Sequence, residues 1–123
     1  MADVKTAQRG FVPDGKMELF QEYESENMQM YSDKAMIRRH IVFYGWVQGV
    51  GFRYRARHAA ELYGCTGCCR NNWDGSVTME IQGTEEQIDQ VILAIEAGRF
   101  VKIENMDSRT IPLVDREYGF KSE

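Results

Sequence analysis

The chain has 123 residues, which is enough for one domain with a substantial core and too few for two. Apolar residues make up 43% and charged residues 28%, as in an ordinary globular protein, and no run of 18 apolar residues predicts a membrane span. The net charge of −4 argues against general nucleic-acid binding, so we expect no nucleic-acid partner. The absence of an apolar run means that we expect no membrane partner either.

Residues 1–35 differ in composition from the rest of the chain. They carry seven acidic and four basic residues and show only a loose helical pattern, with Leu19 and Tyr23 four residues apart. We interpret them as a flexible or partly helical N-terminal extension, and the alternative is a packed arm or a partner-binding helix. The patterns sharpen beyond this segment, so residues 36–123 are predicted to form the domain.

The beginning of the chain lacks the basic start and apolar core of an export signal. Three cysteines, Cys65, Cys68 and Cys69, are clustered and odd in number. Without an export signal, reduced thiols and a cytoplasmic location are the simplest interpretation of this set.

The first predicted elements are a strand, a glycine-rich junction and a short helix. Apolar and polar residues alternate over residues 37–47, with Ile41 on one side of the strand and Arg38 on the other. After the junction, helical spacing gives an inner face made of Ala56, Ala59, Ala60 and Tyr63. Gly64 is expected to end this helix.

The second half of the domain begins with a predicted hairpin. Residues 65–71 and 76–82 read as two strands, and the Asp74–Gly75 pair between them is a strong turn signal. Thr84 and Gln87 then form a capping box at the start of a second helix. The inner face of that helix carries Ile88, Val91, Ile92 and Ile95.

The remaining elements are a strand over residues 100–111, with a bulge expected near Glu104 and Asn105, and a short final strand in YGFK. The order is strand, helix, strand, strand, helix, strand, plus a terminal strand. We therefore predict an α+β, ferredoxin-like βαββαβ sandwich, in which two helices pack on one face of an antiparallel sheet. That fold hosts many unrelated functions and does not identify one by itself.

The junction VQGVGFR, residues 47–53, has no side-chain oxygen that could cap the first helix. Gly49 and Gly51 allow positive φ, and successive N–H groups in such a loop can form an anion-binding nest. Arg53 lies in the first turn, where the helix dipole disfavours a cation unless an anion lies between them. A phosphate-like ligand would supply the cap and account for the arginine; the alternative is a plain glycine turn with a solvated arginine.

Two motifs resemble those of the acylphosphatase family. The family carries Gly-x-Val-Gln-Gly-Val-x-[Phe/Tyr]-Arg, and this chain has GWVQGVGFR at residues 45–53. Its second signature is Gly-[aromatic]-[Ala/Val/Cys]-[Lys/Arg/Gln]-Asn-x-x-x-Gly-x-[Val/Ile]-x5-Gly. GCCRNNWDGSVTMEIQG at residues 67–83 matches it except at the aromatic position, which is Cys68. The resemblance covers about residues 37–121 and does not reach the N-terminal extension.

The resemblance implies hydrolysis of the carboxyl–phosphate bond of acyl phosphates to a carboxylate and inorganic phosphate. It implies that Arg53 binds the substrate and that Asn71 orients the attacking water. It also implies a phosphate-binding loop made of Gln48, Gly49, Val50, Gly51 and Phe52. The chemistry agrees, because phosphoryl transfer mainly needs positioning and charge stabilisation, and a carboxylate leaves without a strong acid. We expect a monomeric hydrolase that needs no metal and no cofactor.

Other reactive side chains have ordinary structural explanations. The CTGCC segment offers fewer than the four or so ligands that zinc prefers, so buried strand thiols are expected there, and redox sensing is the alternative. His58 is expected to be a surface or satisfied histidine rather than a catalytic base. Arg55 and Arg57 are expected on the solvated face of the helix, where either can raise the local positive potential.

The competing hypothesis is a binding module of the same fold that holds phosphate or an acyl phosphate without turning it over. The family also includes acylphosphatase-like domains within larger hydrogenase-maturation proteins. Because this chain shows no further domain and keeps both Arg53 and Asn71, we expect the free-standing enzyme.

Overall fold

The computed structural model describes residues 35–123, and the predicted extension lies outside this range apart from Ala35. Seven elements follow one another: β1 (Met36–Trp46), α1 (Phe52–Tyr63), β2 (Thr66–Asn71), β3 (Val77–Thr84), α2 (Glu85–Glu96), β4 (Lys102–Ile111) and β5 (Phe120–Ser122). This is the order predicted from the sequence. Neither helix in this part of the chain is long and apolar enough to cross a membrane.

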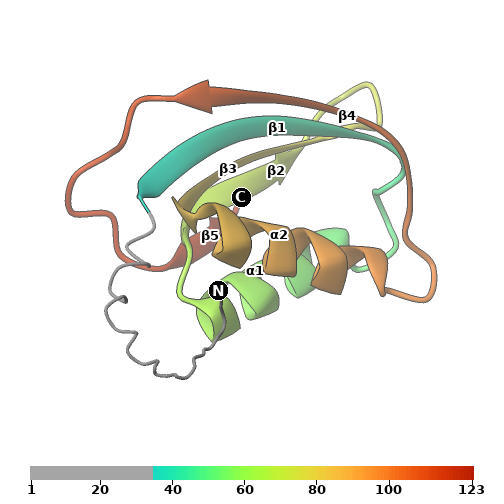
Figure 1. Ribbon diagram of the computed structural model, residues 1–123. Helices are drawn as coiled ribbons and strands as arrows, with labels where there is room; N and C mark the ends of the chain where they lie inside the picture. The colour runs from blue at the N-terminus through green and yellow to red at the C-terminus, as the bar shows by residue number, and fades with distance from the viewer. Residues whose placement is uncertain (1–34) are drawn as a thin grey trace, which may run out of the picture. The chain divides into compact units, whose positions relative to one another are not determined.

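The strands form one sheet in the order β4-β1-β3-β2-β5. β1 pairs antiparallel with β3 and β4, and β2 pairs antiparallel with β3, whereas β5 runs parallel to β2. Both helices cover the same face of the sheet (Figure 1). The ferredoxin-like prediction is therefore confirmed, and the terminal strand makes the sheet mixed rather than purely antiparallel.

The hydrophobic core lies between the helices and the sheet. Alternate residues of the central strands face the helices, including the fully buried Phe43 of β1 and Met79 of β3. The predicted apolar stripes of α1 and α2 are buried against them. Phe52 packs edge-on against Phe43, with ring centroids 4.9 Å apart. Because burying a phenylalanine contributes about 1.5–3 kcal/mol, this contact fixes the first residue of α1 on the core.

The predicted end of α1, the predicted start of α2 and the predicted bulge are also confirmed. Gly64 ends α1 with φ of 78°. At the start of α2, Gln87 N donates to Thr84 Oγ1 at 3.2 Å, and Thr84 N donates to Gln87 Oε1 at 2.8 Å. The register between β1 and β4 shifts after Tyr44, so Glu104 has no opposite residue.

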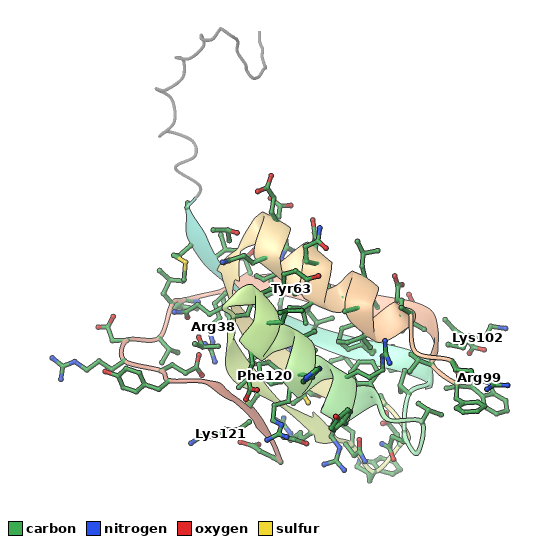
Figure 2. All side chains as sticks on the ribbon, turned by 90° about the horizontal axis from the view of Figure 1, so that it is seen from below. Arg38, Tyr63, Arg99, Lys102, Phe120 and Lys121 are labelled. Carbon is green, nitrogen blue, oxygen red and sulfur yellow. The ribbon has the colours of Figure 1, made fainter. Side chains whose placement is uncertain are left out.

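The sequence did not predict that Arg38 is buried. Arg38 and Gln82 lie opposite each other in β1 and β3, on the sheet face turned away from the core. Residues 112–119, here called the strap, cover this position between β4 and β5. Glu117 of the strap accepts from Arg38 Nη1 at 2.7 Å, and Val114 exchanges two hydrogen bonds with Gln82. Arg38 is only 3% exposed as a result. Figure 2 shows Arg38 beside the strap.

Candidate active site

The predicted phosphate-binding loop lies at the end of β1, directly before α1. Gly49 and Gly51 both adopt positive φ, 73° and 83°, which other residues rarely adopt. No side chain caps α1, and its first turn contains no acidic residue. The N–H groups that begin the helix are therefore left for a ligand or for water, as the sequence predicted.

A cavity of about 350 Å³ opens beside this loop. It is lined by Val47, Gly49, Gly51, Phe52, Arg53, Tyr54, Arg57, Asn71 and Ser122. The structure thus brings Arg53 and Asn71 together with much of the loop, although they come from different elements. No aspartate, glutamate or histidine is among the lining residues, so its two arginines give the cavity a positive charge in a chain of net charge −4.

Two residues of the predicted loop, Gln48 and Val50, do not line the cavity. The Gln48 side chain turns away from it, and its Nε2 donates to the main-chain oxygens of Asn72 at 2.7 Å and Ser76 at 2.8 Å. Val50 packs against the edge of the core. Their side chains therefore hold the loop in place rather than face a ligand.

The two neighbouring asparagines of the β2–β3 turn have different surroundings. Asn72 Nδ2 donates to Ser76 Oγ at 2.9 Å and to Thr78 Oγ1 at 2.7 Å, so its amide builds the turn. Asn71 is the last residue of β2, is exposed, and lines the cavity. Within residues 35–123 its side-chain amide has no hydrogen-bond partner, which leaves it available to a ligand or to water.

Arg53 has a contact that the sequence did not suggest. Its Nη1 donates to the main-chain oxygen of Glu123. The amide of Glu123 donates in turn to the carbonyl of Cys69 at 2.8 Å, which continues the pairing of β5 with β2. The short final strand was predicted, but nothing in its sequence indicates which sheet edge it joins, so this contact could not be foreseen.

The remaining polar residues of α1 have separate roles. Arg55 donates from Nε and Nη2 to the carbonyl of Ala94, at 3.1 and 2.9 Å, and so ties α1 to α2. The ring of His58 stacks on that of Tyr54, with centroids 5.9 Å apart, and His58 does not line the cavity. His58 is a surface residue, as predicted, whereas Tyr54 and Arg57 belong to the cavity wall and the sequence did not assign them there.

None of the three cysteines lines the cavity. Cys65 and Cys69 are buried, and this burial raises the pKa of their thiols to about 11 and about 12, so both are protonated at neutral pH. Cys68, which replaces the family's aromatic residue, is half-buried opposite Glu80 on the sheet face turned away from the helices. Across the part of the chain that the structure describes, no three His, Cys, Asp or Glu side chains gather as metal ligands do.

Comparisons with known proteins match this chain to acylphosphatases. A protein-family model, Acylphosphatase, matches residues 39–122. An acylphosphatase from Clostridium acetobutylicum is 41% identical over 88 residues, covering 70% of this chain and 97% of the relative. One from Geobacillus kaustophilus is 46% identical over 72 residues, covering 58% of this chain and 77% of the relative.

Solved structures give the same result. The crystal structure of acylphosphatase from Bacillus subtilis matches with a TM-score of 0.65 and 26% identity, covering 71% of this chain and 98% of that one. Full-length HypF in its phosphate- and nucleotide-bound form matches with a TM-score of 0.64 and 28% identity, covering 73% of this chain and 12% of HypF. The family match spans more than half of the sequence and takes in the whole cavity wall, so this chain belongs to the acylphosphatase family.

Proposed function

We propose that this chain hydrolyses the carboxyl–phosphate bond of acyl phosphates and releases a carboxylate and inorganic phosphate. One observation carries the proposal. The uncapped start of α1, the guanidinium of Arg53 and the unpartnered amide of Asn71 face one cavity. These are the groups that the reaction needs: anion-binding N–H groups, a phosphate-binding cation and a neutral group that can hold water.

The phosphoryl group binds at the loop. Its oxygens accept hydrogen bonds from the free N–H groups around Gly49 and Gly51, and the positive end of the helix dipole favours their charge. Arg53 closes the site from the first turn of α1, where its planar guanidinium suits paired phosphate oxygens. A bound dianion also removes the repulsion between Arg53 and the helix end.

Asn71 orients the nucleophile. Its amide holds a water molecule beside the phosphorus, and the water oxygen attacks in line with the bond to the carboxyl oxygen. That P–O bond breaks, and its electron pair leaves with the carboxylate. One proton of the water passes to a phosphoryl oxygen, so the products are a carboxylate and dihydrogen phosphate, which then equilibrates with solvent. An asparagine cannot act as a base at neutral pH, and positioning is the contribution that its amide can make.

The leaving group determines which substrates react. A carboxylate is stable as an anion and needs no proton as it departs, whereas an alkoxide does. The cavity wall contains no carboxyl or imidazole group that could supply one. We therefore expect acyl phosphates to react and simple phosphate monoesters to be poor substrates.

Phosphate release from benzoyl phosphate tests the proposal, with glycerol phosphate as the monoester comparison and excess chelator in a parallel assay. We expect turnover of benzoyl phosphate alone, unchanged by the chelator. Activity lost in chelator and restored by Mg²⁺ or Zn²⁺ would contradict the metal-independent mechanism. Binding of inorganic phosphate without any turnover would instead support the non-catalytic module.

The setting of the enzyme is part of the proposal. The described residues contain three free thiols, Cys65, Cys68 and Cys69, which suits a reducing compartment such as the cytoplasm. The core of residues 36–123 is closed by their own helices, which supports a monomer. Sizing chromatography with light scattering on the full chain checks the monomer, and fractionation of cells checks the location.

A further inference from the structure

The cavity contains a second arginine that the proposed mechanism does not use. Arg57 follows Arg53 by four residues on α1, so the two side chains leave the same helix face with Cβ atoms about 5–6 Å apart. Both line the cavity. Like charges at this spacing repel each other, and a helix gains nothing from the pair unless something anionic lies nearby.

Arg57 differs from its neighbour Arg55 in having no internal role. The guanidinium of Arg55 donates to the carbonyl of Ala94, and these hydrogen bonds join α1 to α2. The Arg57 guanidinium forms no hydrogen bond, ion pair or ring contact with any residue that the structure describes. It is exposed, and no carboxylate lines the cavity to neutralise it. Its charge is therefore fully available to a molecule bound there.

The cavity has room for more than a phosphate. Its volume of about 350 Å³ lies at the lower end of the range typical of small-molecule sites. Tyr54, the residue after Arg53, also lines the cavity, and its ring stacks on that of His58. An aromatic residue therefore adjoins Arg53 in the cavity wall, with a free guanidinium one helical turn further along.

We propose that Arg57 forms a second anion subsite, so that preferred substrates are acyl phosphates whose acyl part carries a carboxylate or phosphate of its own. The inference rests on the proposed function. Arg53 and the loop hold the transferred phosphoryl group, Tyr54 contacts the acyl chain or ring, and the guanidinium of Arg57 pairs with the distal anion. Planar guanidinium suits both anions, because each presents two oxygens side by side.

The test compares matched substrates. Benzoyl phosphates carrying a carboxylate at ring position 3 or 4 are assayed beside the corresponding carboxamides, which have nearly the same shape and no charge. A phosphonate at the same positions shows whether carboxylate or phosphate is preferred. The measured quantity is the ratio of kcat/KM for each charged substrate to kcat/KM for its carboxamide, which cancels general changes in activity.

We expect the wild-type ratio to be roughly tenfold at one or both ring positions, as a charge-assisted hydrogen bond would give. Arg57→Gln is expected to bring the ratio close to one, and Arg57→Lys to restore part of it. Arg109→Gln is the matched control, because Arg109 is an exposed arginine on β4 outside the cavity and its loss changes the net charge equally. This control is expected to keep the wild-type ratio.

Two results would overturn the inference: a wild-type ratio near one for every charged substrate, or a ratio that Arg57→Gln leaves intact. Either can occur while all the benzoyl phosphates are hydrolysed, in which case the proposed function stands. If none of them is hydrolysed, the proposed function fails and the subsite fails with it.

Discussion

The side-chain amide of Gln48 donates a hydrogen bond to the main-chain oxygen of Asn72, with 2.7 Å between the two atoms. The same nitrogen donates to the main-chain oxygen of Ser76 at 2.8 Å, so one side chain is hydrogen-bonded to both ends of the β2–β3 turn. Asn71 is the residue directly before that turn. Gln48 thus links the proposed phosphate-binding loop to the turn that follows the amide proposed to hold water.

Replacing Gln48 by Ala removes both hydrogen bonds to the turn. The free energy of unfolding is expected to fall by about 1–2 kcal/mol, because two carbonyl groups lose a partly buried donor. A small displacement of the loop is expected to lower kcat/KM by roughly tenfold or more. Gln48→Glu is the sharper variant, since a carboxylate facing two carbonyls repels them, and it is expected to lower both quantities further. Wild-type kinetics in both variants would show that the loop keeps its place without the side chain.

Replacing Arg53 tests the proposed phosphate ligand. Arg53→Ala is expected to remove at least ~3 kcal/mol of transition-state stabilisation, a hundredfold or more in rate. Arg53→Lys keeps the charge without the paired donors and is expected to recover only part of the loss. The free energy of unfolding without ligand is expected to change by less than ~1 kcal/mol, because relief of the unfavourable helix-dipole interaction opposes the lost contact with Glu123.

Thermal unfolding with added phosphate provides the control for that prediction. A ligand that binds only the native state raises its stability, so phosphate is expected to protect the wild type far more than Arg53→Ala. Equal protection of both proteins, together with near-normal turnover of the variant, would reduce the loop to a plain turn.

The adjacent asparagines allow a matched pair of substitutions. Asn71→Ala is expected to lower kcat by roughly a hundredfold, with little change in phosphate affinity or stability, because its amide only positions water. Asn72→Ala removes the donors to Ser76 and Thr78 and is expected to lower the free energy of unfolding by about 1–2 kcal/mol. A parallel loss of phosphate binding in Asn71→Ala would make that residue a ligand contact instead.

The ion pair between Arg38 and Glu117 predicts an acid-sensitive contribution to stability. Partial burial of the Glu117 carboxyl acts to raise its pKa, but hydrogen bonds from Arg38 and Thr66 and the charge of Arg38 outweigh this effect, and the pKa lies below its usual 4.5. As the pH falls, the unfolded state takes up this proton first. The contribution is therefore complete above the ordinary pKa and disappears as the pH falls through the lower, folded-state pKa.

Urea denaturation between pH 3 and pH 8 measures this contribution. Glu117→Gln is expected to lower the free energy of unfolding by about 1–3 kcal/mol at pH 7, since Arg38 loses a close charged partner. The difference from wild type is expected to shrink below about pH 4.5. Glu104→Gln, at the exposed bulge of β4, is the control and is expected to show no such trend. A difference that stays constant with pH would mean that the ion pair does not stabilise the strap.

Much of the fold could be predicted because its signals are local. The alternation of β1, the stripes of α1 and α2, and the capping box at Thr84 depend on residues within a few positions of one another. The candidate site was predicted for a related reason, since the loop, Arg53 and Asn71 fall in two short motifs. Their convergence on one cavity follows once β1 and β2 both pair with β3.

What the sequence by itself determined was therefore the order of elements, the uncapped helix start and the identity of the motif residues. Only the tertiary structure decided three further features. These are the contact of Arg53 with Glu123, the burial of Arg38 under the strap, and the different surroundings of Arg55, which bonds to α2, and Arg57, which lines the cavity. Each joins residues far apart in the chain, or depends on which neighbour a long side chain reaches. A periodic pattern assigns a residue to a face of its own element, but whether that face meets a partner, a ligand or water depends on how the elements pack.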